Sequence, residues 1–230
     1  MPNLLMPLYI TINTTGKRRN FITSNTQDIY WLLLNKIIQN KEPTCIKRWE
    51  ETYKINSNIW PDIFEIPFKV CRETYLQSFQ YRIIHRILPC KYWLNKLKIV
   101  ENNICTYKYC TNKEPDTIQH FLINCPPVID FWESFVTWWN QLDYFKLRPL
   151  IEVNIILGFP NVTNEDTVLN YCLILAKQYI YSCKAHEQQL FLLSFLQILK
   201  NKLNIEKEIH IQRSTLTKFY SSWGYLQESL

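Results

Sequence analysis

Four potential metal ligands lie within one short window of this 230-residue chain. Cys105, Cys110, His120 and Cys125 form the pattern C-x4-C-x9-H-x4-C. Three thiolates and an imidazole make a complete tetrahedral shell for zinc, and a filled shell leaves no position for a catalytic water. The spacing therefore predicts one structural Zn2+ ion, closed by a local loop, and not a metallohydrolase centre. The alternative is that these cysteines are small buried apolar residues.

Hydrophobic periodicity predicts a mainly α-helical chain, with helical bundle-like halves flanking a small Cys3His zinc knuckle. Apolar residues recur at helical spacing, and the three glycines are too few for Gly-rich phosphate loops or a turn-rich β-sandwich. Helices are expected over 24–41, 43–53, 69–88, 92–100, 117–124, 126–142, 164–186, 187–212 and 214–230. A linker is expected over 56–67, and an extended segment or loop over 148–160.

The predicted elements and the charge divide the chain into regions. They are a basic N-terminal arm (1–23), a basic helical region (24–100), the zinc knuckle (101–127) and a C-terminal helical region (128–230). The net charge of +6 is unevenly spread: residues 66–113 carry nine Lys or Arg against two acidic residues, and residues 114–176 carry two against eight. Charge separated in this way suits the binding of a polyanion on one face.

Cations and aromatic residues are interleaved before and inside the knuckle. The candidate nucleic-acid-binding residues in this basic segment are Arg82, Arg86, Lys91, Lys96, Lys98 and Lys108. Arg82 and Arg86 are expected to share a helix face at i, i+4 spacing. Phosphates pair with Arg and Lys, and bases stack on exposed rings, so the cluster predicts binding of RNA or DNA that is largely independent of sequence. Each residue taken singly also fits a solvated helix face beside core aromatics.

Several motifs occur in a specific order. A basic helical run, LQSFQYRIIHRILP at 76–89, precedes the cysteine pair; DTIQH at 116–120 and Cys125 follow, and then Phe131 and Trp132. Over roughly residues 25–145 this order resembles the zinc-binding C-terminal region of LINE-type (non-LTR) retrotransposon reverse transcriptases. The gap between the first two cysteines is wider here than in that family. The resemblance implies the same four zinc ligands, Cys105, Cys110, His120 and Cys125.

The resemblance also implies a function for the chain as a tail fragment. Family members carry an endonuclease and a polymerase upstream, and their tails are implicated in binding RNA or DNA during target-primed reverse transcription. The expected partners are therefore nucleic acid and, within a longer protein, the upstream polymerase region. Two alternatives remain: a structural or docking module of the polymerase that binds no nucleic acid, and a non-functional remnant of the element.

The sequence offers no catalytic motif and no targeting segment. It has no Asp-Asp pair for a polymerase metal site, no H-E-x-x-H, no G-x-S-x-G and no P-loop, so we expect no enzyme activity. No signal peptide and no run of about 18 apolar residues is present, so neither secretion nor a membrane is expected. Eight cysteines in such a chain favour reduced thiols and metal binding in the nucleus or cytoplasm.

Overall fold

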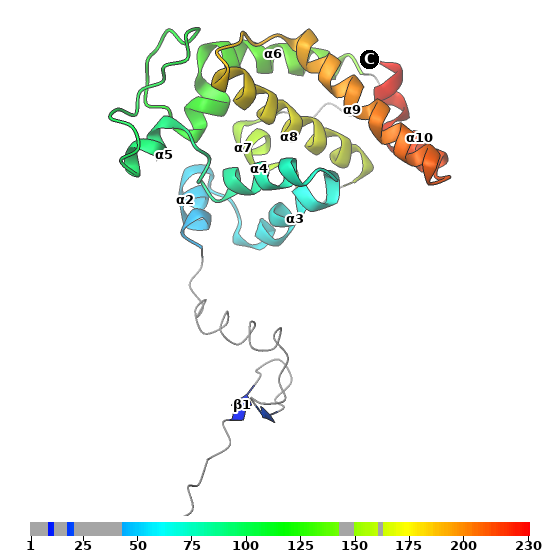
Figure 1. Cartoon of the computed structure of the whole chain (residues 1–230), viewed down its shortest axis with the longest axis horizontal. Helices are drawn as coiled ribbons and strands as arrows, with labels where there is room; N and C mark the ends of the chain where they lie inside the picture. The colour runs from blue at the N-terminus through cyan, green and yellow to red at the C-terminus, as the bar shows by residue number, and fades with distance from the viewer. Residues whose placement is uncertain (1–8, 12–17, 21–42, 143–149, 161–162) are drawn as a thin grey trace, which may run out of the picture. The chain divides into compact units, whose positions relative to one another are not determined.

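The computed structural model describes residues 9–11, 18–20, 43–142, 150–160 and 163–230 (Figure 1). Its contacts divide the chain into two compact units, 1–44 and 45–230. In the first unit, β1 (Tyr9–Thr11) and β2 (Arg18–Asn20) form an antiparallel pair with Tyr9 opposite Asn20. The helix expected over 24–41 lies outside the described residues.

From Thr44 onward most of the described chain is helical, so the prediction of a mainly α fold is confirmed. Its elements are α2 (Thr44–Tyr53), the 3-10 turn η2 (Ser57–Ile59), α3 (Trp60–Val70), α4 (Thr74–Ile84), α5 (Lys91–Lys96), the π-helical turn η3 (His120–Asn124), α6 (Pro126–Asn140), α7 (Glu152–Leu157), α8 (Asn164–Ala185), α9 (Leu192–Gln212) and α10 (Leu216–Glu228). The knuckle and the helical segments on both sides of it contribute to one hydrophobic core.

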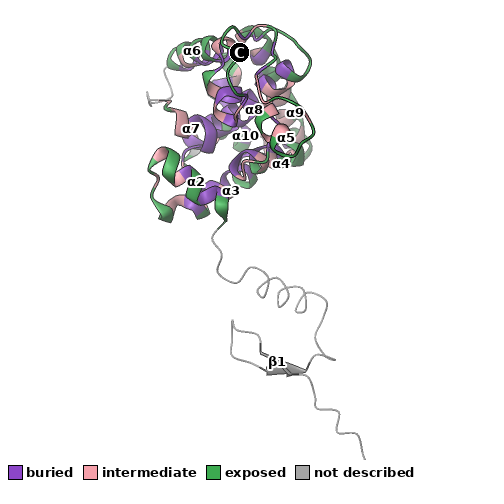
Figure 2. Cartoon of the chain, turned by 90° about the vertical axis from the view of Figure 1, so that its left-hand side faces the viewer, coloured by how far each residue is buried: buried purple, intermediate pink, exposed green. Residues whose placement is uncertain are grey.

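Helix α8 lies at the centre of the second unit. It contacts α3, α4, α9, α10 and η3, and buried residues occur on all of its faces (Figure 2). A helix that is apolar on all sides is stable only when other elements surround it. Its start is set by a capping box, in which Thr163 Oγ1 accepts the Asp166 N–H and Asp166 Oδ2 accepts the Thr163 N–H. The other helices are therefore arranged around α8.

A buried lysine joins α8 to two neighbouring elements. Lys177 Nζ lies 2.6 Å from Gln80 Oε1 on α4 and 2.8 Å from the Ile156 carbonyl oxygen on α7. No carboxylate of the described residues pairs with this ammonium, and burial lowers the pKa of Lys177 to about 7. Burial in the core therefore destabilises the protonated form of the Lys177 side chain.

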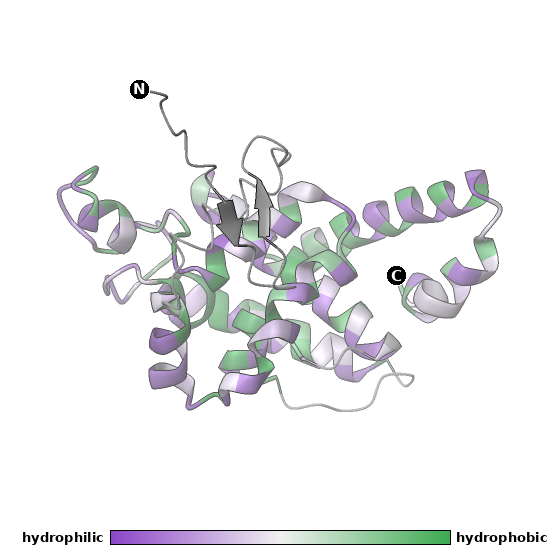
Figure 3. Ribbon diagram, turned by 90° about the horizontal axis from the view of Figure 1, so that it is seen from below, coloured by the Kyte–Doolittle hydropathy of each residue, from purple (hydrophilic) through white to green (hydrophobic). Residues whose placement is uncertain are grey.

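Helices α9 and α10 form an antiparallel hairpin at the C-terminal end (Figure 3). Phe195, Leu199 and Leu203 on α9 and Phe219 on α10 are buried. In contrast, Leu193 on the outer side of α9 is 80% exposed. The hairpin thus packs one apolar stripe on the core, as the periodicity of the sequence predicts.

The segment between α2 and α4 was wrongly predicted as a linker followed by one long helix. Residues 60–70 form α3 and residues 74–84 form α4, with an extended residue, Cys71, after α3. Pro61 lies in the first turn of α3, where its missing N–H costs nothing. Pro67 lies inside the helix, and an apolar stripe packed on α8 outweighs its lost hydrogen bond.

The segment 148–160 was also predicted wrongly, because α7 occupies part of it. This six-residue helix ends at Gly158, whose φ of 93° is unfavourable for residues with a Cβ. A Cβ at this position would lie 2.9 Å from Asn170 Oδ1. Asn170 on α8 makes hydrogen bonds to both the N–H and the carbonyl of Phe159. Tertiary contacts to α8 therefore define a helix too short for periodicity to reveal.

Candidate metal centre

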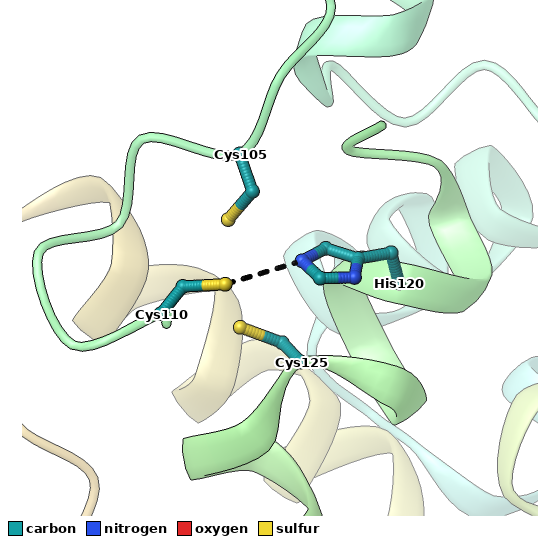
Figure 4. Close-up of side chains that lie close together, drawn as sticks. All are labelled: Cys105, Cys110, His120 and Cys125. Atoms are coloured by element: carbon teal, nitrogen blue, oxygen red, sulfur yellow. Dashed lines mark hydrogen bonds between the residues drawn. The ribbon is translucent and has the colours of Figure 1, made fainter. Parts of the chain in front are cut away.

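The four predicted ligands converge on one point in the second unit (Figure 4). Cys105 and Cys110 come from the loop before η3, His120 begins η3, and Cys125 follows it. Their donor atoms all lie within 4.8 Å of one another. Donors on tetrahedral zinc are about 3.8 Å apart, so the group needs little contraction to hold an ion. All four residues are buried, and together they can bind one metal ion away from water.

A short antiparallel contact positions the first two cysteines. The Cys105 N–H donates to the Glu114 carbonyl at 2.9 Å, and the Asp116 N–H donates to the Asn103 carbonyl at 2.7 Å. The loop between these contacts turns back on itself, and Cys110 lies in that turn with its sulfur 3.6 Å from His120 Nε2. The four-residue gap between the cysteines is therefore accommodated by a loop that is closed at its base.

A π-helical turn brings the second pair of ligands together. Residues i and i+5 lie roughly 140° apart around an α-helix. In η3, the Cys125 N–H instead donates to the His120 carbonyl at 2.9 Å, an i to i+5 bond. Thr117 Oγ1 accepts the His120 N–H at 3.1 Å, and Trp132 Nε1 donates to the Leu122 carbonyl at 2.8 Å. The threonine and tryptophan of the motifs in this region thus stabilise the turn that carries the ligands.

Glu114 faces the far side of the histidine ring. Its Oε2 atom lies 3.4 Å from His120 Nδ1, a buried atom with no closer hydrogen-bond partner. Because Nε2 points at the sulfurs, Nδ1 is the atom that carries the proton when the ring binds a metal. A carboxylate behind a metal-binding histidine orients the ring and raises its basicity. Glu114 was not among the predicted site residues, although its position between the two ligand pairs is a usable signal.

Asp116 and Lys184 form a buried ion pair beside the donors. Lys184 Nζ, from α8, lies 3.6 Å from Asp116 Oδ1, and their side chains are 3% and 6% exposed. Asp116 Oδ2 also accepts the Lys91 N–H at the start of α5. Burial raises the pKa of the Asp116 carboxyl. Asp116 thus connects the knuckle to α5 and α8, whereas nothing in the sequence placed Lys184 near the ligands.

The thiols of the cluster differ in their proton affinity. A hydrogen bond from Cys125 is the largest cause that lowers the pKa of Cys105, and a hydrogen bond with His120 and the charge of Lys184 add to it. The same Cys105–Cys125 hydrogen bond raises the pKa of Cys125. The two shifts are opposite because these two sulfurs share one hydrogen bond. Metal binding releases the protons that the thiols carry.

The other cysteines are buried free thiols, as expected of residues that pack in helices. Cys90, the nearest to the cluster in sequence, precedes α5 and is not part of the four-residue group. Within the described ranges no other set of His, Cys, Asp and Glu side chains has metal-binding geometry. The metal centre is therefore confined to the predicted window.

Two histidines outside the cluster have packing roles. His85 contacts the rings of Tyr81 and Phe64, at centroid distances of 4.0 and 5.5 Å. His210 is 8% exposed, and its Nε2 lies 3.3 Å from Glu206 Oε1. The folding of α10 against α9 buries it, which local sequence does not reveal.

The candidate nucleic-acid-binding residues fall into two groups. Lys96, Lys98 and Lys108 are exposed, whereas Arg82 and Lys91 are half-buried. All three exposed lysines belong to a segment that we call the α5–knuckle lobe, residues 90–119. Backbone hydrogen bonds from the start of α5 to Asp116 hold its two parts together. Lys113, in the same segment, is exposed as well, so the lobe presents four accessible positive charges.

Arg86 does not share a helix face with Arg82, because α4 ends at Ile84. Its backbone has a left-handed φ of 58°. Its guanidinium carbon lies 4.1 Å from the centroid of the Trp49 ring, and Nη1 is buried without a hydrogen-bond partner. The side chain therefore packs on α2 as a cation–π contact and is less accessible than the sequence suggested.

Exposed apolar side chains accompany the lysines of the lobe. Leu97 is 50% exposed and Ile99 is 65% exposed, on either side of Lys98. Lys108 Nζ lies 4.8 Å from the Tyr109 ring centroid. This surface therefore combines charge with accessible apolar area.

Comparisons with known proteins do not assign the chain to a family. No protein-family model matches it, and no curated protein matches it. Among the described helices, none combines the length and apolar character needed to cross a bilayer.

Proposed function

We propose that Cys105, Cys110, His120 and Cys125 hold one structural zinc ion. Three sulfurs and one imidazole nitrogen are the donors that zinc prefers, and no water position remains once they bind. The convergence of all four buried donors within 4.8 Å is the observation that supports this most strongly. Bound zinc would cross-link the loop of the first two cysteines to η3 and the start of α6.

On this basis we propose that the chain is a non-catalytic nucleic-acid-binding module, like the zinc-binding tails of LINE-type reverse transcriptases. The exposed Lys96, Lys98 and Lys108 of the α5–knuckle lobe support this role, because phosphate contacts of this kind carry little sequence preference. Arg82 and Lys91 are half-buried and can add weaker contacts. Arg86 is assigned a smaller part because it packs on Trp49.

A salt titration of binding to single-stranded RNA and to duplex DNA tests this proposal. The triple variant Lys96→Gln/Lys98→Gln/Lys108→Gln should bind single-stranded RNA more weakly and lower the slope of log K against log salt by about 2. Lys47→Gln/Lys200→Gln/Lys218→Gln, which removes three exposed lysines outside the lobe, is the matched control and should bind like the wild type. If the wild type binds neither single-stranded RNA nor duplex DNA at low salt, the proposal is refuted.

The exposed apolar residues favour a second candidate, a docking module for an upstream polymerase region. Leu97 and Ile99 offer a small accessible apolar surface, of the kind that marks protein contacts. In that case Leu97→Ser/Ile99→Ser would abolish polymerase binding while the lysine variant would not. The opposite pattern, with nucleic-acid binding lost only in the lysine variant, favours the first candidate.

A further inference from the structure

Lys184 places a buried positive charge against the segment that carries the four donors. Its Nζ lies 4.0 Å from the Phe121 ring centroid and 5.6 Å from the Tyr107 ring centroid. Phe121 directly follows His120, and Tyr107 lies between the first two cysteines. The lysine comes from α8, so it reaches the site from a helix far away in sequence. It also lies 3.5 Å from the Phe121 carbonyl oxygen.

The charge around this lysine changes when the proposed zinc site is filled. With neutral thiols, Asp116 and Lys184 form a balanced ion pair. Three thiolates, one neutral imidazole and Zn2+ together carry one net negative charge. The loaded centre and Asp116 then place two negative charges beside one buried ammonium. Because such charges are poorly screened away from water, the ammonium stabilises the loaded state more than the metal-free state.

We infer that Lys184 is the counter-cation of the metal centre, a positioning residue that raises zinc affinity through its charge. The inference rests on the proposed zinc site. This role goes beyond joining α8 to the knuckle. An ion pair that served only as a structural link would stabilise the zinc-loaded and the metal-free state equally. Asp116 competes with the centre for the same ammonium.

This competition gives the two members of the pair opposite predicted effects. Lys184→Met removes the only charge that offsets the loaded centre within this pair, so zinc affinity should fall about 10- to 100-fold. Asp116→Asn leaves the ammonium to the centre alone, and its side-chain oxygen can still accept the Lys91 N–H. Its zinc affinity should equal or exceed that of the wild type.

Zinc affinity is measured on the full chain by competition with a chromophoric chelator, and Co2+ absorption reports the coordination shell. Lys177→Met is the matched control, because it makes the same substitution on the same helix, at a lysine bonded to α4 and α7. It should bind zinc like the wild type. Circular dichroism establishes that each variant is folded.

A fall for Lys184→Met with no fall for Asp116→Asn supports the inference. An equal fall for both variants, or a change of less than about threefold for a folded Lys184→Met, overturns it. If Lys184→Met does not fold, Asp116→Asn decides: unchanged or tighter binding supports the counter-cation role, and weaker binding overturns it. A wild type that binds no zinc would refute the proposed metal site itself, which is a separate result.

Discussion

The α5–knuckle lobe and the helices around α8 are stabilised in different ways. Helix α8 has 22 residues and is buried on all sides, whereas α5 has six residues, none of them fully buried. The lobe is connected by a few backbone hydrogen bonds and by four donors directed at one point. The lobe adds only a few residues, such as Tyr107 and Ile118, to the hydrophobic core. Apolar burial therefore stabilises the helices around α8 more than the lobe, which depends more on a cross-link. Metal loss should therefore affect the lobe first.

The largest expected effect is on zinc binding. Cys125→Ser removes a ligand from a site whose binding energy is about 10–16 kcal/mol in small zinc modules, so zinc should be lost. Amide hydrogen exchange should then speed up across residues 90–125, while the amides of α8 remain protected. Cys172→Ser, at a buried cysteine of α8 outside the cluster, is the control and should keep zinc. If Cys125→Ser speeds up amide exchange equally in residues 90–125 and in α8, the two regions are not stabilised in different ways.

The reverse experiment damages the helical core. Phe135→Ala removes a fully buried ring that contacts Trp132, Trp139 and Phe195. The free energy of unfolding should fall by about 3–5 kcal/mol, as for other buried aromatic residues. Chemical denaturation measures the loss, and metal analysis below the transition should still find bound zinc. Loss of zinc from the folded variant would show that the lobe depends on the core more than its contacts suggest.

Some features of the two regions could be predicted from the sequence and others could not. The metal ligands were predictable because side-chain chemistry and spacing identify them directly. The long helices α6 and α9 were predictable because their apolar stripes extend over several turns, and α8 because its apolar residues continue over a length typical of a buried helix. A helix over 117–124 was predicted, and η3 lies within it. Its π-helical form was not predicted, since an i to i+5 bond in one short turn leaves no periodic signal. Lys184 was not either, because only the packing of α8 brings it to the knuckle.

Helix α3 illustrates a different reason for failure. Its two prolines carry a strong local signal for a break, and the apolar stripe that packs on α8 outweighs it. The prediction for Arg86 failed for the opposite reason, because it assumed a helix where the chain leaves one. Helical periodicity placed it beside Arg82, but α4 ends two residues earlier and the side chain turns to Trp49. In both cases tertiary packing overrides local preference.

An intermediate effect is expected from the buried lysine of the core. Its pKa is lowered to about 7 by burial, so between this value and its ordinary pKa the unfolded chain binds more protons than the folded one. The free energy of unfolding contributed by Lys177 therefore rises with pH across that window, by no more than about 5 kcal/mol. Lys177→Met should flatten this rise in denaturation curves measured from pH 7 upward. A parallel curve for the variant would contradict the shift.

The smallest expected effect concerns the junction between the two regions. Trp132→Phe keeps an aromatic ring but removes the Nε1–H that donates to the Leu122 carbonyl in η3. Leaving that buried carbonyl without this donor should cost about 1–3 kcal/mol and weaken zinc binding modestly. Trp139→Phe, on the same helix, is the matched control for loss of an indole. If the two variants have the same zinc affinity, the hydrogen bond to η3 has no part in positioning the ligands.

Native mass spectrometry of the purified full chain tests the central claim most directly. The wild type should carry one zinc ion per chain, and Cys105→Ser should carry none while the helices around α8 stay folded by circular dichroism. A wild type that is fully folded and free of zinc, with exchange protection in the α5–knuckle lobe equal to that of α8, would contradict the account.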